Sequence, residues 1–587
     1  MSTSERSNAL PNAPSVSEAA SPSRHDFLIL LVLFVAFRAM TLLAFRPGGL
    51  VQDHSDFYWY REFAQLTRQG YLPYVNLWTT YPPLFPFLMI GVWWISTLLP
   101  PWEFPNLWFT LLLGGTFLLF EAGNLVLIHA IANRLSNSRD ALRSTWFYAL
   151  LFTPVYTLTG WFESYPLFFF LLGLYLLLRG RPLWSALVCG FGFMIKLIPI
   201  VLLPVGLRLA RAEKRRITVT RLSLDLDIRQ AVTYLGVFVI TVVLIGLPFY
   251  LLDSRLVWGS LTISNARAPW ETVWALLEGR FDYGIIPLDM RDLSWEPTGV
   301  SSSLPWPLIT LAFAALFAVI YTRPCDWKQP RNVVALSGFA VVLFTLYSKG
   351  YSPQWLGWVL IFVALLIPNR RGVFYAVVLS GANLIEGNIF FTIVPDEHWL
   401  LMLTVGVRTL VFILVAAECV FVLRPPWFGV GLRRTWHWLL VGLAAALAIG
   451  SVPAGMRFVH AYFEVRHQLS PYRATIDTLR AGSQRGAALI LNSYDHRSYD
   501  WLYPYLRDRL SFYMLDDYAP PGESVEVRTL ARLEQIAARH RDGWFFDSQP
   551  AHTSSSEAIL TEWLAQHAEV LEVRDVDGGR LQRFHLR

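Results

Sequence analysis

Charged residues and cysteines are both scarce in this 587-residue chain, and each scarcity excludes a class of protein. Only 16% of the residues are charged and 54% are hydrophobic, whereas soluble domains usually carry about 25% charged residues. Apolar runs of about 20 residues, the length that crosses a bilayer, recur along the sequence. The three cysteines (Cys189, Cys325, Cys419) lie in or beside such runs, which argues against a disulfide framework or a cysteine-based metal site. The composition predicts a polytopic α-helical membrane protein.

The formal net charge of +6 does not indicate a nucleic-acid partner, because the cations cluster in short loops between apolar runs. Lysine and arginine are enriched in cytoplasmic loops of membrane proteins. We therefore expect the following basic segments in the cytoplasm: 134–143, 179–181, 208–221, 323–331, 370–371 and 424–434. Residues 1–25 are rich in Ser, Pro and Ala and too polar for a signal peptide, which predicts a disordered cytoplasmic N-terminus.

The apolar runs and the alternation of basic loops predict about 13 transmembrane helices, within a range of roughly 11–14. The expected helices cover about 27–45, 107–131, 144–158, 165–178, 182–196, 197–210, 231–251, 305–322, 332–347, 353–368, 372–390, 399–423 and 435–454. Segment 84–100 is also apolar, but counting it as a span would move 134–143 outside the cell. We expect it to lie in or dip into the outer interface, where tryptophan is favourable. The transmembrane domain is then 26–455, with a first external loop at about 46–106.

The last part of the chain, 456–587, changes in character and predicts a small extracytoplasmic α/β domain. Strand and helix patterns alternate there, as in α/β folds. The expected elements are strands at 486–493 and 542–548, helices at 527–540 and 556–566, and a hairpin with a Gly-Gly turn at 571–586. Because this part has no motif residues of its own, we interpret it as a cap or an acceptor-docking module.

The stretch Gln52–Leu84 is polar and rich in Tyr, Trp and Pro, and it lies between two apolar runs. Residues 56–69 can form an amphipathic interfacial helix. Asp56 would lie at its N-cap, where a carboxylate often serves only to cap the helix. Capping and catalysis are compatible, so the pattern leaves both interpretations open. Asp53 is a second carboxylate in the same loop.

The order of features in this stretch resembles the first external loop of the GT-C glycosyltransferases. The matching features are Asp56, an aromatic-rich helix, Gly70, Pro73-Tyr74 and Tyr81-Pro82-Pro83-Leu84. Two later segments, GWFESYPLFFFLLGLYLLLRGRP (160–182) with MIKLIPIVLLP (194–204), and YSKGYSPQWLGWVL (347–360), are similar to later parts of the same class. The similarity is greatest to the polyprenol-phosphate-mannose-dependent mannosyltransferases of glycosyltransferase family 87.

This resemblance implies a GT-C fold and transfer of a sugar, mannose first, from a polyprenyl-phosphate donor to an extracytoplasmic glycan, lipid or protein. It also implies that an Asp of the loop is the catalytic base, and the position before the aromatic helix matches Asp56. An Asp-x-Asp form would fall here on Asp53-His54-Ser55-Asp56, which is one residue too wide. Whether Asp53 assists stays open.

Transfer from a lipid phosphate needs a base for the acceptor proton and cations for the leaving phosphate. Lys196 and Lys349 are expected near external helix ends, where an ionisable group is either a functional candidate or a lysine that reaches out to the interface. Arg255 and Arg267 are candidates because guanidinium forks suit phosphate oxygens. Glu163 either positions the acceptor or a cation, or is a solvated loop charge, and the second interpretation is slightly favoured.

The other candidates are polar residues beside apolar runs. Tyr81, Tyr351 and Gln354 are candidate substrate ligands. Glu386 and Asn388 either face a cavity or pair with another helix, and His398 alone is weak evidence of a metal. No cofactor is required by the sequence, and a divalent cation stays open.

Two classes of function are compatible with these observations. The first is an inverting glycosyltransferase of the plasma membrane, acting among membrane lipids on mannose or on another sugar such as arabinose or aminoarabinose. The second is a non-enzymatic lipid or solute transporter, which predicts ionisable residues inside several spans and an internal repeat of helices. The sequence shows few such charges and no convincing repeat, which favours the enzyme.

Overall fold

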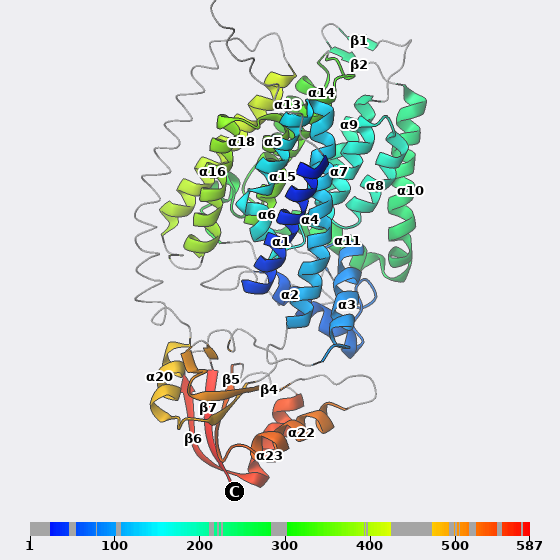
Figure 1. Ribbon diagram of the computed structural model, residues 1–587. Coiled ribbons are helices and arrows are strands. Elements are labelled where there is room, and N and C mark those ends of the chain that lie inside the picture. The colour runs from blue at the N-terminus through cyan, green and yellow to red at the C-terminus, as the bar shows by residue number, and fades with distance from the viewer. Residues whose placement is uncertain are drawn as a thin grey trace, which may run out of the picture.

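Apolar helices of very different lengths make up the first two thirds of the computed structural model, and a small α/β domain follows (Figure 1). The structure describes residues 24–45, 55–77, 79–100, 107–209, 217–219, 222–224, 227–282, 302–323, 325–391, 394, 397–423, 472–491, 498, 502–503, 505–515, 524–548, 555–576 and 579–587.

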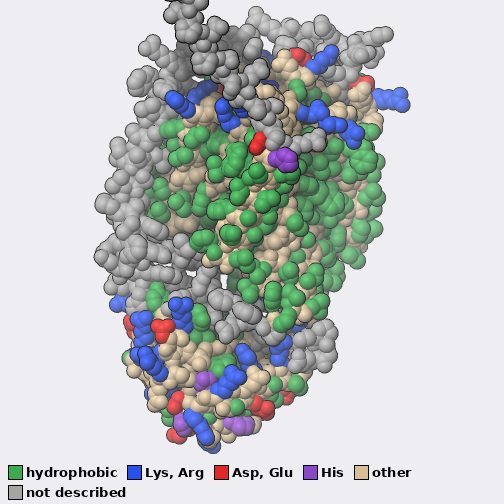
Figure 2. Space-filling view, viewed as in Figure 1, with side chains coloured by type: hydrophobic (Ala, Val, Ile, Leu, Met, Phe, Trp, Pro, Cys, Tyr) green, Lys and Arg blue, Asp and Glu red, His purple; other side chains and the backbone are tan. Residues whose placement is uncertain are grey.

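Among the residues that the structure describes, six helices are long and apolar enough to cross a membrane. They are α1 (Arg24–Ala44), α4 (Leu107–Leu135), α10 (Ile228–Leu252), α14 (Pro330–Tyr347), α16 (Arg370–Leu384) with the π-helix η5 (Ile385–Phe390), and α18 (His398–Val422). Helix α10 lies at the edge of the bundle, and its Leu244 is 70% exposed. On the face seen in Figure 2, hydrophobic side chains cover much of the bundle, which suits contact with lipid. The chain is a polytopic α-helical membrane protein.

Shorter apolar helices fill the bundle between these six. They are α3 (Leu84–Ser96), α7 (Ser164–Leu178), α8 (Pro182–Phe193), η2 (Ile198–Leu202) with α9 (Leu203–Leu209), α13 (Trp306–Tyr321), and η4 (Pro353–Trp355) with α15 (Leu356–Leu366). Helix α15 is buried on nearly every side, which explains why its sequence is apolar all round. The count of about 13 spans stays a prediction, and the helix expected at 435–454 lies outside the described residues.

The single helix expected at 144–158 is wrong, because two helices occupy this region. They are α5 (Ser138–Ala149) and α6 (Phe152–Leu158). Pro154 has no N–H to donate, and within a continuous helix its ring would clash with the carbonyl of Leu150. Leu151 is therefore extended (φ −67°, ψ 135°), and α6 begins as a new helix with Pro154 in its first turn.

The polar loop after α1 folds into a compact unit. Helix α2 (Phe57–Gln65) continues into η1 (Leu66–Gln69), which confirms the expected amphipathic helix. Its Phe57, Tyr60 and Ala64 are buried in one cluster with Phe85 of α3. The turn that ends η1 needs glycine, because Gly70 has a φ of +86°. Helix α3 is about 20 Å long, short of the ~30 Å hydrocarbon core, and its interfacial position stays a prediction.

The described residues of the helical part also include two short helices and one small hairpin. Helices α11 (Ser254–Ala266) and α12 (Val273–Leu277) follow α10, and β1 (Ile217–Val219) pairs with β2 (Leu222–Leu224). The hairpin lies at the end of the bundle away from the C-terminal domain, whereas α2 and α3 lie at the near end (Figure 1).

The C-terminal domain contains a five-stranded sheet with the order β4-β3-β5-β7-β6. Its strands are β3 (Ala487–Leu491), β4 (Leu510–Met514), β5 (Asp542–Asp547), β6 (Ala568–Val576) and β7 (Gly579–Leu586). Its helices are α20 (Arg473–Gly482), α22 (Val525–Ala537) and α23 (Ser555–His567). Strand β3 is buried on both faces and parallel to both neighbours, which explains its unbroken apolar run.

The elements expected in this domain are confirmed, and two were missed. Strands β3 and β5, helices α22 and α23 and the β6–β7 hairpin lie where the pattern predicted them, although residues 577–578 of the hairpin turn are outside the described residues. Strand β4 and helix α20 were not predicted. The side of the membrane and the role of the domain stay predictions.

Candidate active site

Asp56 is the residue directly before α2, as predicted, but its side chain does not cap the helix. Its main-chain N–H donates to the Gly160 carbonyl (3.0 Å), which ties the loop to the turn between α6 and α7. Its carboxylate accepts a hydrogen bond from the Tyr60 hydroxyl (3.2 Å), one turn along the helix. The interpretation of Asp56 as a plain cap is therefore wrong, and the carboxylate has acceptor capacity for another partner.

The environment of Asp56 makes its carboxyl a base suited to neutral pH. Burial raises the pKa of Asp56 to about 6. The hydrogen bond from Tyr60 and the charges of Lys196 and Arg267 lower it, and the charge of Glu163 raises it. Two cations and a second carboxylate therefore lie close enough to influence this group. A carboxyl with such a pKa can accept a proton in catalysis.

Lys196 and Glu163 form a partly buried ion pair beside Asp56. Lys196 lies in the turn after α8, and its ammonium also faces the rings of Phe162 (5.0 Å) and Trp355 (5.3 Å). Glu163, at the start of α7, accepts a second hydrogen bond from the Trp358 indole N–H (2.8 Å). Only 4% of Glu163 is exposed, so its interpretation as a solvated loop charge is wrong.

The segment that carries Arg267 is held against the turn after α14. The Arg267 guanidinium stacks on the Trp270 ring (3.8 Å). Trp270 donates its main-chain N–H to the Lys349 carbonyl (3.3 Å) and accepts from the Tyr351 N–H (3.1 Å). Gly350 is needed here, because a Cβ at this position would lie 2.1 Å from the Trp270 ring. The loop 267–272 and the turn 349–352 thus form one structural unit beside Asp56.

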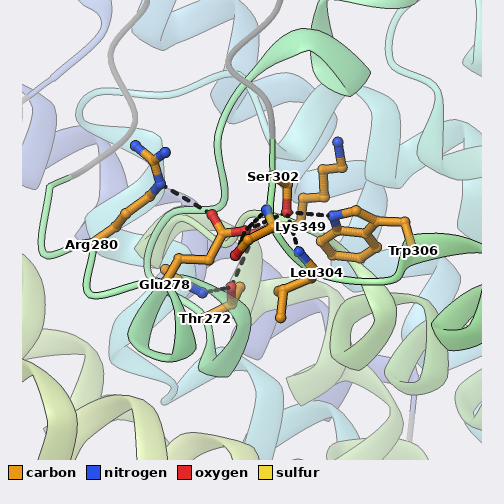
Figure 3. A network of polar contacts seen from close by, with 9 residues as sticks. Thr272, Glu278, Arg280, Ser302, Leu304, Trp306 and Lys349 are labelled. Atoms are coloured by element: carbon orange, nitrogen blue, oxygen red, sulfur yellow. Dashed lines mark hydrogen bonds and ion pairs between the residues drawn. The ribbon is translucent and has the colours of Figure 1, made fainter.

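Lys349 lies in a second polar network, centred on Glu278 (Figure 3). Glu278 accepts hydrogen bonds from Arg280 (3.1 Å), Ser302 and the Ser303 N–H (2.9 Å). The Lys349 ammonium faces the Trp306 ring (5.2 Å). Burial lowers the pKa of Lys349, and the charge of Glu278 raises it. The two lysines singled out from the sequence therefore have different carboxylate neighbours.

The remaining predicted ligands have different surroundings. Arg255 is 88% exposed and pairs with Asp253 (3.0 Å). Tyr81 packs against Phe162 (4.9 Å between ring centres), and burial and the Asp56 charge raise the pKa of Tyr81. Tyr81 therefore lies near Asp56, whereas Arg255 pairs with a carboxylate two residues before it in the chain.

Tyr351 and Gln354 lie in the turn between α14 and α15. Tyr351 is buried, and its hydroxyl donates to Asn383 (3.3 Å). Gln354 is half-buried in η4. Asp53 lies outside the described residues. Contacts of these three residues with a substrate stay predictions.

Glu386 pairs with another helix, the second of the two alternatives for this residue. Its partner is Arg408 of α18, which also donates to the main-chain carbonyl of Glu271. Arg408 and Glu271 were not among the site residues predicted from the sequence. A lone arginine inside the apolar run of 398–422 was the available signal for Arg408. Asn388 is half-buried in the π-helix η5.

Metal-binding groups are not assembled in the part of the chain that the structure describes. The His398 ring stacks on Phe281 (4.0 Å between ring centres). No group of three His, Cys, Asp or Glu side chains is placed to hold a metal ion among the described residues. The question of a divalent cation stays open.

Ionisable residues inside the spans are more numerous than the sequence analysis assumed. Arg38 of α1 lies 3.8 Å from Glu121 of α4, and Glu121 accepts from the Tyr148 hydroxyl (2.9 Å). Glu386 and Arg408 form a second such pair. These charges neutralise one another within the protein, the usual arrangement for ionic groups at membrane depth.

Fold and site together define a helical membrane protein with a buried cluster of acids, cations and aromatic rings at one end of its bundle. Neither the protein-family models nor the curated protein sequences contain a match. The solved structures to which this chain is similar include ArnT from Cupriavidus metallidurans bound to undecaprenyl phosphate. The TM-score is 0.41 and the identity 12%, over 96% of this chain and 98% of that chain.

Two further solved structures are similar over most of this chain. The Archaeoglobus fulgidus oligosaccharyltransferase in the apo form has a TM-score of 0.30 and 11% identity, over 90% of this chain and 70% of that chain. The arabinofuranosyltransferase AftD from Mycobacteria has a TM-score of 0.29 and 12% identity, over 97% of this chain and 40% of that chain. Similarity at this level assigns no function, which has to come from the site.

Proposed function

We propose that this protein is an integral membrane glycosyltransferase of the GT-C type that uses a polyprenyl-phosphate sugar as donor. The observation that carries the proposal is the arrangement around Asp56. This carboxyl has a pKa of about 6, does not cap its helix, and lies near both Lys196 and Arg267. A base and two cations in one partly buried place are the groups that transfer from a lipid phosphate requires.

The proposed reaction is a single displacement that inverts the sugar carbon. The acceptor hydroxyl oxygen attacks the anomeric carbon while Asp56 takes the hydroxyl proton. The bond between that carbon and the phosphate oxygen breaks, and the phosphate leaves with the electron pair. The leaving polyprenyl phosphate gains negative charge, which Lys196 and Arg267 stabilise by charge-assisted hydrogen bonds.

The other residues of the cluster have supporting roles in this scheme. Glu163 holds the Lys196 ammonium in place and is itself held by Trp358. Trp270 orients Arg267 through the stacked guanidinium. We keep Lys349 and Arg255 as candidate phosphate ligands, with Glu278 and Asp253 as their competing partners. Tyr81, Tyr351 and Gln354 are candidate ligands of the sugar or acceptor, and Asp53 a candidate helper of Asp56.

The side of the membrane follows from the basic loops. The hairpin β1–β2 lies in and next to the basic segment 208–221, at the end of the bundle away from α2 and the C-terminal domain (Figure 1). If basic loops face the cytoplasm, then the site and residues 472–587 face the outside of the plasma membrane. The resemblance to family 87 mannosyltransferases favours mannose as the donor sugar, and arabinose or aminoarabinose are the alternatives.

The test is a transfer assay with the purified full-length protein in proteoliposomes. The donors are polyprenyl phosphates carrying labelled mannose, arabinose or aminoarabinose, and the acceptors are the lipids and glycans of the producing cell's envelope. We expect one donor to give labelled product together with free polyprenyl phosphate. Asp56→Asn should reduce the rate about 10²–10⁴-fold, the usual contribution of a general base.

A matched control for this variant is Asp140→Asn. Asp140 is an exposed carboxylate that pairs with Arg143 at the surface (3.5 Å), so its loss should leave transfer unchanged. Transfer by correctly inserted Asp56→Asn at the parental rate would show that Asp56 is not the base. Movement of the lipid or its sugar across the membrane without transfer would favour the transporter.

A further inference from the structure

Glu271 has a main-chain conformation that is rare for its residue type. Its φ is +50°, in the left-handed region where a residue with a Cβ is strained. It is only 2% exposed. It directly follows Trp270, and the Arg267 guanidinium stacks on the Trp270 ring. Strain of this kind persists only when the surrounding structure enforces it.

The main chain at this position receives a hydrogen bond from Arg408, 137 residues later in the chain. One nitrogen of its guanidinium donates to the Glu386 carboxylate, and another donates to the Glu271 carbonyl. The flat face of the same group stacks on Tyr351 (3.7 Å). A single buried side chain thus joins α18, the π-helix η5, the turn 349–352 and the loop 267–272.

The charges of this cluster balance if Glu271 holds a proton. Burial and the nearby Glu386 carboxylate raise the pKa of Glu271 well above its ordinary value. A protonated Glu271 would contribute its main chain and its volume to the cluster, beside the ion pair that Arg408 and Glu386 form.

The strained residue lies close to the proposed phosphate site. The charge of Arg267 lowers the pKa of both Glu271 and Asp56, so Arg267 lies close to both carboxyls. Its place depends on the loop 267–272, because its guanidinium rests on Trp270. Release of the left-handed turn at Glu271 would move Trp270 and with it the guanidinium.

We propose that Arg408 is a positioning residue for the lipid phosphate: by clamping the left-handed main chain of Glu271, it holds Arg267 in the orientation that meets the donor. The consequence for activity rests on the proposed function, whereas the clamp itself does not. Arg408 touches no substrate in this scheme and acts through Trp270 and Arg267.

The clamp is tested first without any substrate, by hydrogen exchange of the full-length protein in detergent. The amide of Trp270 is the reporter, because it donates to the Lys349 carbonyl across the joint between the two loops. In Arg408→Lys the cation remains, but the fork that reaches both acceptors is lost. We expect peptides covering 267–273 to exchange about tenfold faster. Unchanged exchange in this variant would overturn the clamp, whatever the protein's activity.

Substitutions at Glu271 separate backbone strain from loss of charge. Asn tolerates the left-handed region and Gln does not, and both are as neutral as the protonated acid. Glu271→Asn should therefore restore slow exchange to Arg408→Lys, and Glu271→Gln should not. Glu271→Val leaves Arg408 in place but strongly disfavours a positive φ, so it should also speed exchange. If Arg408→Lys fails to fold, Glu271→Val still tests the clamp. Slow exchange of peptides 267–273 in Glu271→Val would count against the clamp.

The kinetic arm measures donor KM and kcat in the transfer assay. Arg267 also meets the negative charge that the phosphate already carries in the bound donor. Arg408→Lys should therefore raise the donor KM about tenfold, close to the cost of one left-handed residue. The part of the contact that forms only in the transition state should appear as a smaller decrease of kcat. Glu271→Asn should return KM to within about threefold of the parent. A merely structural role would instead lower the amount of active protein, and with it kcat, at constant KM.

The matched control is Arg371→Lys. Arg371 of α16 and Glu418 of α18 form an ion pair. This pair resembles that of Glu386 and Arg408, because η5 directly continues α16. Glu418 lies ten residues after Arg408, about 15 Å along α18. This variant should change neither the exchange of 267–273 nor the donor KM. If exchange responds as expected while no donor is transferred by the parent, the clamp stands and the proposed function fails. Fast exchange with an unchanged donor KM would instead refute the positioning role.

Discussion

The rate of sugar transfer should rise with pH through a midpoint near 6, because Asp56 can take the acceptor proton only when it is ionised. Its pKa is about 6, compared with an ordinary value of 3.8, and burial is the largest cause. At pH 5 about a tenth of the carboxyls are ionised, and at pH 7 about nine tenths. Between these values kcat/KM should therefore change about tenfold, whereas an aspartate with an ordinary pKa would leave it nearly flat.

Two variants shift this midpoint in opposite directions. Glu163 raises the pKa of Asp56 and Lys196 lowers it. Glu163→Gln should therefore move the midpoint to lower pH, and Lys196→Gln should move it to higher pH. Both variants also lose a group that orients or binds the phosphate, so the readout is the position of the midpoint and not the rate. The sign of each shift follows from the charge that is removed.

The assay is kcat/KM for the lipid donor at constant ionic strength between pH 4.5 and 8.5 (a range of about two units on each side of the midpoint). The value kcat/KM reports the ionisation of the free enzyme. The donor phosphodiester stays ionised throughout, and activity after return to pH 7 excludes irreversible unfolding. A midpoint near 4, or shifts of the two variants in the same direction, would refute the assignment of Asp56 as a buried base.

Three further outcomes are expected from the packing. Gly350→Ala should displace the Trp270 ring, which lies 2.1 Å from the new Cβ, and raise the donor KM about tenfold. The control Gly357→Ala, where the space around the new Cβ is open, should leave the donor KM unchanged. Glu121→Leu should leave Arg38 without its carboxylate and cost about 3–5 kcal/mol of stability, measured as a lower Tm in detergent; Arg38→Met in addition should recover most of it. Leu489→Ala, in the buried core of the C-terminal sheet, should cost about 2–5 kcal/mol and expose 472–587 to protease before the helical part.

The sequence alone indicated where the candidate site residues lie, for a physical reason. In a chain that is 54% hydrophobic, a polar or charged residue next to an apolar run is costly and so needs a cause. Lys196 was selected by this logic, Asp56 by its position before the aromatic helix, and Arg267 because guanidinium suits phosphate. Glu163 was a weaker candidate on an external turn, and the structure places all four in one neighbourhood. The helix after Asp56 was also predictable, because amphipathic spacing is a local pattern.

The pairing of these groups could not be predicted, because pairing depends on contacts far apart in the chain. Glu163 looked like a loop charge, and only the packing of α7 against α15 shows that Trp358 and Lys196 satisfy it. Arg255 and Lys349 had the same signal as Arg267, yet each has a different acidic neighbour. Local sequence gives the type of a residue, and tertiary contacts decide what it faces.

What the sequence by itself determined is therefore the class of the protein and the loop that bears its acids, since scarcity of charge and the period of apolar residues are local properties. Only the tertiary structure decided that Asp56 does not cap its helix, that two helices replace one at 138–158, and that Arg408 holds Glu271 in a left-handed turn. The cause is the same in each case. Burial, and a partner brought from another helix, override the preference that a residue has on its own.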